Sequence, residues 1–126
     1  EFKSNNSLFN WFMNTTHKST VKGYSNHIWN GVSTAVFAKI INQIIKSKIS
    51  LPNKFHLVPS DKISKYNILK FLNKIHKKSI KLIEYKPKQK IDRTLSTNYK
   101  DLNLEIWNKT FKKQLTIREI IKDYIY

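Results

Sequence analysis

Residues 64–85, SKYNILKFLNKIHKKSIKLIEY, decide the fold class. Their first part predicts a helix capped by Ser64, because apolar residues recur at the three- and four-residue spacing that places them on one helix face. These apolar residues are Ile68, Leu69, Leu72 and Ile75. From Ser79 to Tyr85 the apolar residues alternate with other residues, which predicts a strand. A helix followed directly by a strand indicates a mixed α/β protein.

The segments on either side extend this alternation of helices and strands. The clearest is an amphipathic helix that begins at Ser33 or Thr34 and ends near Lys48. Thr116 and Glu119 form a capping-box pattern, which predicts the last helix. The other expected elements are a helix over residues 4–14, a strand over 21–24, a loop over 24–31, a strand over 54–58 and an extended segment over 91–96.

The length and composition limit the class of protein. A chain of 126 residues is enough for one domain with its own core, and 40% hydrophobic residues are too many for a disordered chain. The absence of cysteine excludes disulfide frameworks and thiolate zinc sites. There is no apolar run long enough to span a membrane, and the first residues lack the pattern of a signal peptide. We therefore expect a soluble cytoplasmic protein.

The formal net charge of +16 has two interpretations. Such an excess is typical of proteins that bind polyanions, so a small Lys-rich nucleic-acid-binding module is one hypothesis. However, 22 of the 24 basic residues are lysines, and only Arg93 and Arg118 carry the guanidinium that favours bidentate contacts. Lys, Ile, Asn and Tyr all have codons rich in A and T. A biased genome composition therefore explains the charge without a function, and this interpretation is favoured.

Residue spacing alone indicates no catalytic centre, cofactor cradle or metal site. The histidines and carboxylates are scattered, and the two glycines, Gly23 and Gly31, cannot form a Gly-rich phosphate loop. Tyr66 and Lys70 have a Tyr-x-x-x-Lys spacing that can place a phenol beside an ammonium for proton transfer. A Lys-rich chain produces that spacing by chance, so we interpret this pair as surface and boundary residues of a helix.

Asp92 and Arg93 are the other isolated feature. The simpler interpretation is a local ion pair between the two side chains. The alternative is that the guanidinium contacts an anion, for which a diphosphate has a suitable geometry.

Six segments in fixed order carry a resemblance to a known family. They are SLFNWF (7–12), VKGYSN (21–26), WNGVST (29–34), FHLV (55–58), ISKY (63–66) and IDRTLS (91–96). Together they resemble the C-terminal half of dTDP-4-dehydrorhamnose reductase-like proteins, which are extended short-chain dehydrogenases that act on nucleotide sugars. The resemblance covers nearly the whole chain. It implies an α/β fragment whose dinucleotide-binding glycines and catalytic residues lie in an N-terminal half upstream of Glu1.

The resemblance also implies an organisation and a function. Residues 1–126 form a single region, with late elements of an NAD(P)-binding Rossmann sheet and a substrate loop over 1–60 and mainly a small substrate-binding lobe over 61–126. The full-length relative reduces a 4-keto group on a dTDP- or UDP-linked deoxysugar with NADPH or NADH, as in polysaccharide biosynthesis. Its partners are the nucleotide sugar, the missing Rossmann half and a possible second copy in a homodimer, without nucleic acid or membrane.

By the same resemblance, this chain carries substrate-binding residues but no catalytic, cofactor-binding or metal-binding residues. Tyr24, Asn26, Trp29 and Asn30 are expected to contact the sugar or the base, and Arg93 the phosphates. The same half also occurs in related epimerases and in non-catalytic relatives, which remain open alternatives.

Overall fold

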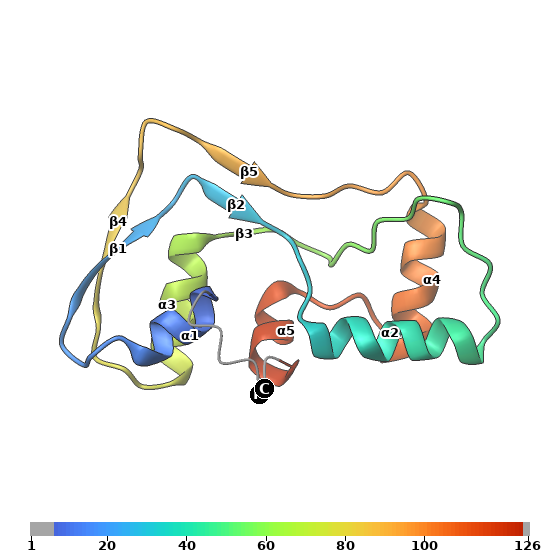
Figure 1. Cartoon of the computed structure of the whole chain (residues 1–126), viewed down its shortest axis with the longest axis horizontal. Coiled ribbons are helices and arrows are strands. Elements are labelled where there is room, and N and C mark those ends of the chain that lie inside the picture. The colour runs from blue at the N-terminus through green and yellow to red at the C-terminus, as the bar shows by residue number, and fades with distance from the viewer. Residues whose placement is uncertain (1–6, 125–126) are drawn as a thin grey trace.

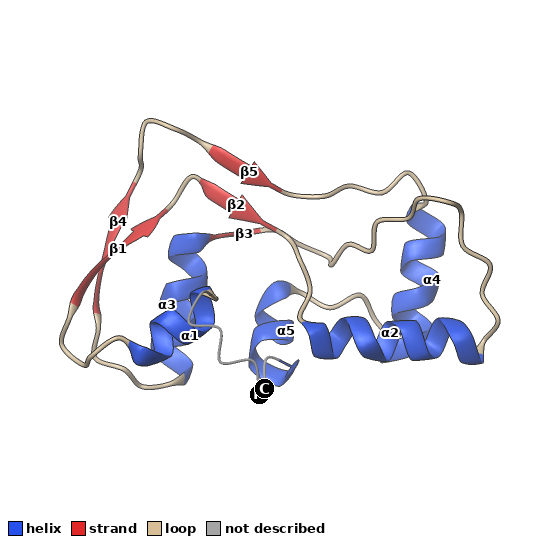
Figure 2. Cartoon of the chain, viewed as in Figure 1, coloured by secondary structure: helices blue, strands red, loops and turns tan. Residues whose placement is uncertain are grey.

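The structure is a computed structural model of the chain, and it describes residues 7–124. Short strands run along one side, and α1, α3 and α5 lie beneath them, while α2 and α4 pack together at the other end (Figures 1 and 2). The elements are α1 (Leu8–Asn14), β1 (Thr20–Tyr24), β2 (His27–Trp29), α2 (Thr34–Lys46), β3 (Ile63–Ser64), α3 (Lys65–Ile75), β4 (Lys81–Tyr85), β5 (Ile91–Arg93), α4 (Lys100–Phe111) and α5 (Ile117–Tyr124). The predicted α/β class is confirmed.

The strands form two small sheets. In the first, β1 lies parallel to β4, with Tyr24 opposite Tyr85. In the second, β2 is central, antiparallel to β3 and parallel to β5. The expectation of a loop over residues 24–31 is therefore wrong, because residues 27–29 form β2. A three-residue strand shows no usable periodicity, and both of its partners are distant in the sequence.

The residues expected to cap helices predicted α2, α3 and α5 correctly. The hydroxyl of Ser33 accepts a hydrogen bond from the amide of Val36 at the start of α2, and that of Ser64 accepts one from Asn67 at the start of α3. The structure also confirms the last helix, α5, which follows Thr116. Of the helix expected over residues 4–14, residues 8–14 form α1, and residues 4–6 lie outside the described residues.

The core has two hydrophobic clusters that α5 connects. The first contains Phe12, Ile63, Ile68, Leu69, Leu72, Ile80, Ile117 and Ile121. The second contains Val36, Ile40, Ile106, Trp107, Leu115 and Ile120. Ile117 and Ile121 lie one helical turn apart and face the first cluster, whereas Ile120 faces the second. The eight residues of α5 thus join the two ends of the molecule.

The segment over residues 54–58, expected to be a strand, has no regular secondary structure, so that expectation is wrong. No strand lies beside it in the described part of the chain. Instead, the N–H of Val58 donates to the Oδ1 of Asn103 at 3.0 Å, and its carbonyl oxygen accepts from Trp107 Nε1 at 2.8 Å. Both partners belong to α4, a helix that the sequence patterns did not predict. Side chains of α4 thus provide the hydrogen bonds that a neighbouring strand would otherwise supply.

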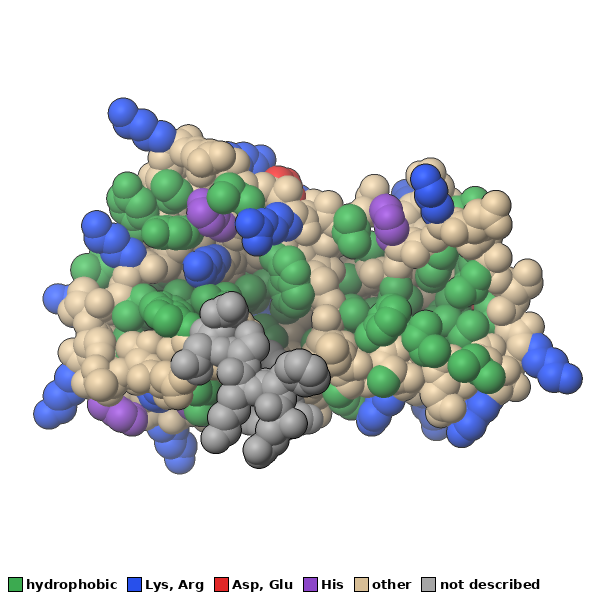
Figure 3. Space-filling view, in the orientation of Figure 1, with side chains coloured by type: hydrophobic (Ala, Val, Ile, Leu, Met, Phe, Trp, Pro, Cys, Tyr) green, Lys and Arg blue, Asp and Glu red, His purple; other side chains and the backbone are tan. Residues whose placement is uncertain are grey.

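Part of the apolar face of α2 is exposed. Val36 and Ile40 are buried against α4, but Phe37, Ile41 and Ile45 are not covered. Figure 3 shows apolar side chains gathered over this end of the molecule, with basic side chains around its edge. Within residues 7–124, none of the helices has the length and apolar composition to cross a membrane.

Candidate functional site

A pocket of about 600 Å³ lies between α1, β2, β5, α3 and α5. This volume is in the range of small-molecule sites. Its described lining residues are Ser7, Leu8, Phe9, Tyr24, His27, Ile28, Trp29, Lys65, Ile68, Leu72, Ile91, Arg93 and Ile121. None of them is Asp or Glu, and the two that carry a formal charge are Lys65 and Arg93. Among the described residues the wall is therefore apolar and aromatic, and the formal charge that it carries is positive.

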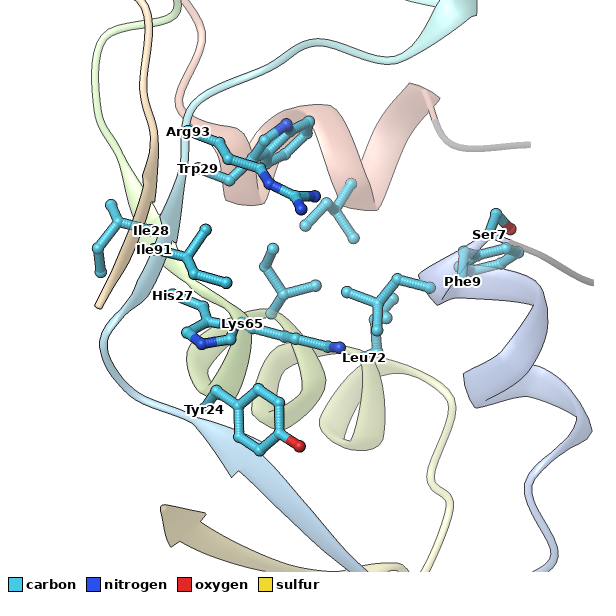
Figure 4. A pocket seen from close by; sticks show the side chains of 13 residues that line it. Ser7, Phe9, Tyr24, His27, Ile28, Trp29, Lys65, Leu72, Ile91 and Arg93 are labelled. Atoms are coloured by element: carbon cyan, nitrogen blue, oxygen red, sulfur yellow. The ribbon is translucent and has the colours of Figure 1, made fainter. Parts of the chain in front are cut away.

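The register of β2 and β5 sets the position of Arg93. Trp29 lies opposite Arg93 in this parallel pair, and His27 lies opposite Ile91. Because side chains alternate along a strand, these four residues share the pocket face. Figure 4 shows the side-chain ends of Tyr24, Lys65 and Arg93 pointing from the strands and α3 toward α1.

Asp92 is turned away from this face and bonded elsewhere. Its Oδ1 accepts hydrogen bonds from the hydroxyl of Thr94 at 2.7 Å and from the amide of Thr94 at 3.0 Å. These bonds lower the pKa of Asp92 below its ordinary value, and the bond from the Thr94 hydroxyl has the larger effect. The ion pairs within residues 7–124 are Glu105–Lys109 and Lys113–Glu119. The local Asp92–Arg93 ion pair is therefore not formed, and the guanidinium faces the pocket with no carboxylate partner among residues 7–124.

Tyr24 is at the centre of an aromatic and cationic group. Its ring meets the ring of His27 edge to face, with centroids 4.7 Å apart. The ammonium of Lys65 lies 5.3 Å from the centroid of the same ring. Tyr24 is the last residue of β1, whereas Lys65 is the first residue of α3. The two elements are brought together across the pocket wall by the packing of α3 on β1.

The two predicted asparagines lie beside the pocket and do not line it. Asn30 is buried, and its amide nitrogen donates to the carbonyl oxygen of Leu95 at 2.8 Å while its Oδ1 accepts from the Leu95 amide at 2.7 Å. Asn26 donates from Nδ2 to the carbonyl oxygen of Pro87 at 2.7 Å. The structure therefore brings Tyr24, Trp29 and Arg93 together, and it uses the asparagines to fix the chain around β5.

Sequence reasoning missed Lys65 and His27 as pocket residues. His27 falls in the segment expected to be a loop. The position of Lys65 could have been recognised from the sequence, because it directly follows Ser64, the residue that caps α3. A helix N-terminus carries partial positive charge and disfavours a lysine, so a lysine at the first helical position needs another reason to be there.

Tyr66 and Lys70 lie at a different, more polar pocket of about 560 Å³. The ammonium of Lys70 is 6.0 Å from the centroid of the Tyr66 ring. Asp61, Glu84 and Arg118 are among the charged residues around them. The pair is thus separate from the positively charged pocket. Within residues 7–124, the structure shows no group of three or more His, Asp or Glu residues placed to hold a metal ion.

Neither glycine is placed to cradle a cofactor phosphate. A Cβ atom at Gly23 would lie 2.7 Å from the Cδ2 atom of Tyr66, and one at Gly31 would overlap the indole of Trp29. Both glycines thus permit close packing of an aromatic ring. Neither glycine therefore belongs to a Gly-rich turn with several free backbone amides, which is the arrangement that holds a dinucleotide pyrophosphate.

The fold is similar to part of two solved dTDP-4-dehydrorhamnose reductases. The similarity is to dTDP-4-dehydrorhamnose reductase from Clostridium acetobutylicum, with a TM-score of 0.65 and 17% identity, over 93% of this chain and 40% of that one. The enzyme of that name from Bacillus anthracis, solved in complex with NADP, matches with a TM-score of 0.62 and 12% identity, over 85% and 38% of the two chains. The predicted resemblance is thus confirmed at the level of the fold.

This chain spans about 40% of the length of the reductases it resembles. No protein-family model matches its sequence, and the search of curated proteins gave no match.

Proposed function

We propose that this chain is the substrate-binding portion of an NAD(P)-dependent nucleotide-sugar reductase. The observation that carries the proposal is the pocket, in which Arg93 and Lys65 supply positive charge while Tyr24 and Trp29 supply aromatic surface. A nucleotide sugar has matching parts. Its diphosphate would meet the positive charge, and its flat base and its sugar would meet the aromatic surface. No carboxylate among the described lining residues would repel the phosphates.

Each side chain has a role in this proposal. Arg93 contacts the phosphates, since its planar guanidinium can donate two parallel hydrogen bonds to phosphate oxygens. Tyr24 and Trp29 contact the base or the sugar. Asn30 keeps the segment after Arg93 in place through its two bonds to Leu95, and its amide reaches the ligand only if those bonds open.

The reaction requires parts that these 126 residues do not supply. We propose that NADP or NAD is held by an N-terminal Rossmann half, and that the whole protein reduces a 4-keto group of a dTDP- or UDP-deoxysugar for polysaccharide biosynthesis. The reductase names of the structural neighbours, and the NADP bound to one of them, support this. A cytoplasmic location, a homodimer and the division of the chain near residue 60 stay predictions.

Nucleotide binding tests this proposal directly. Titration of the chain with dTDP and UDP, followed by tryptophan fluorescence and calorimetry, should show saturable binding. Arg93→Gln should weaken it about tenfold or more, as expected for a lost charge-assisted contact. Arg118→Gln is the matched control, because Arg118 is the only other arginine and lies at the other pocket. No binding by the wild type, or equal losses in both variants, would overturn the proposal.

The nucleic-acid hypothesis predicts a different result in the same assay. A single-stranded oligonucleotide should then bind with a steep dependence on salt concentration, and both arginine variants should weaken it to a similar, small extent. Saturable binding of dTDP that depends on Arg93 and not on Arg118 argues against this hypothesis.

A further inference from the structure

We propose that Lys65 is the second anion-binding residue of the pocket and that, with Arg93, it selects a diphosphate over a monophosphate. This inference rests on the proposed function, because it concerns the same pocket and the same class of ligand. The resemblance to the reductases already implied a diphosphate ligand; the inference adds Lys65 as the residue that, with Arg93, makes the pocket select it.

The first argument is the position of the two cations. Lys65 comes from the start of α3 and Arg93 from the end of β5, so they belong to different walls of the pocket. Figure 4 shows both side chains extending into the space in front of α1. Two cations on separate walls can each hold one phosphoryl group of a diphosphate, whereas a monophosphate has one such group to share.

The second argument is that Lys65 has no anionic partner within residues 7–124. It takes part in neither of the ion pairs found there. Its ammonium instead lies over the ring of Tyr24, a weaker interaction than a charge-assisted hydrogen bond to a phosphate oxygen. A phosphate that enters the pocket therefore competes favourably for Lys65.

The third argument is the location of Lys65 at a helix N-terminus. The first turn of α3 contains no acidic residue, and the partial positive charge of the helix end disfavours a lysine at this place. The same end favours a bound anion. An anion between Lys65 and the N-terminal end of α3 would be attracted by both. It would thereby offset the repulsion between the ammonium and the helix end.

The contact with Tyr24 gives the inference a consequence for the aromatic wall. While Lys65 lies over the Tyr24 ring, the ammonium occupies part of the ring surface. When a phosphate draws the ammonium away, that surface becomes available to the sugar or the base. Phosphate binding and aromatic contact would then be coupled through Lys65.

The test compares the affinities of dTDP and dTMP for the wild-type chain and for variants. The wild type should bind dTDP about tenfold or more tightly than dTMP. Lys65→Gln should lose most of that preference, mainly by weakening dTDP, and Lys65→Arg should retain it. Lys70→Gln is the matched control, since Lys70 is on the same helix and faces Tyr66 in the other pocket.

The outcomes separate this inference from the proposed function. If the wild type fails to bind dTDP, the proposed function fails, and this inference fails with it. If Arg93→Gln weakens dTDP while Lys65→Gln leaves the ratio of dTDP to dTMP affinity unchanged, the proposed function stands and this inference is wrong. Equal weakening of both nucleotides by Lys65→Gln also overturns it. Thermal melting of Lys65→Gln, expected to match the wild type closely, shows that the variant is folded.

Discussion

The ammonium of Lys78 donates a hydrogen bond of 2.8 Å to the carbonyl oxygen of Thr15, the C-cap residue of α1. It also donates to the carbonyl oxygens of Phe12 and Met13, so that all three of its protons are used. Lys78 is only 9% exposed. The carbonyl groups at the end of a helix lack partners within the helix, and here a buried lysine supplies donors to those of Met13 and Thr15, while the carbonyl of Phe12 also accepts from the Thr15 amide. Because α1 forms one wall of the pocket, this contact connects a distant lysine to the candidate site.

Lys78→Met should destabilise the chain and loosen α1. The methionine keeps most of the side-chain volume but removes the donors to the partly buried carbonyl groups of Met13 and Thr15, at a cost of about 1–3 kcal/mol for each group that water cannot reach. Urea unfolding measures the loss, and hydrogen exchange should accelerate over residues 11–16. Lys77→Met is the control, because the neighbouring Lys77 is exposed. Equal stability of the two variants would show that the Lys78 contacts are not stabilising.

Asn30→Ala should release the segment that follows β5. The substitution leaves the amide and the carbonyl oxygen of Leu95 without their partners, and we expect a loss of about 1–3 kcal/mol. Exchange of the Leu95 amide, followed by NMR, should become markedly faster. Asn98→Ala, at an exposed position, serves as the comparison. If the Leu95 amide remains equally protected in Asn30→Ala, the side chain does not hold this segment.

The sequence predicted those features that depend on nearby residues. Ser33, Ser64 and the Thr116–Glu119 capping box act within one helical turn, so their patterns identified the helices that they begin. β2 depends on partners from residues 63–64 and 91–93, which no local pattern contains.

The helix α4 escaped prediction for a related reason. Its inward face includes Asn103, a polar residue that is buried because it bonds the backbone of Val58. A polar residue on the core side interrupts the apolar periodicity that identifies a helix. The same contact between Asn103 and Val58 explains why residues 54–58 do not form the expected strand, because α4 supplies the hydrogen bonds of that backbone. The candidate site was likewise predictable in part: Tyr24, Trp29 and Arg93 were identified, but Lys65 reaches the pocket only through the packing of α3.

Gly31→Ala should displace the indole of Trp29. The added methyl group would overlap three atoms of the indole, so either the ring or the chain must move. We expect a shift in the tryptophan emission maximum and a weaker affinity for dTDP, since Trp29 lines the pocket. Ala38→Gly, at an exposed interior position of α2, tests whether a general loss of helix stability produces the same signals. An unchanged emission spectrum in Gly31→Ala would mean that the ring accommodates the methyl group in place.

The stability contributed by Glu119 should disappear in acid. Its pKa falls from the ordinary 4.5 to about 2, chiefly because of the hydrogen bond from Lys113 and then that from the amide of Thr116. A pKa that is lower in the folded than in the unfolded state means that the unfolded chain binds the proton more readily. Stability from this group is therefore fully present above pH 4.5 and is lost as the pH falls toward 2.

The measurement is the difference in unfolding free energy between the wild type and Glu119→Gln, determined by urea titration across this range. The difference should be largest near neutral pH and should shrink toward zero at the acid end, because the wild-type carboxyl is then protonated as well. Glu105→Gln is the control, since Glu105 forms an exposed i,i+4 pair with Lys109 and caps no helix. A difference for Glu119→Gln that stays constant with pH would show that the amide substitution acts through packing and that the charge of the capping box contributes nothing.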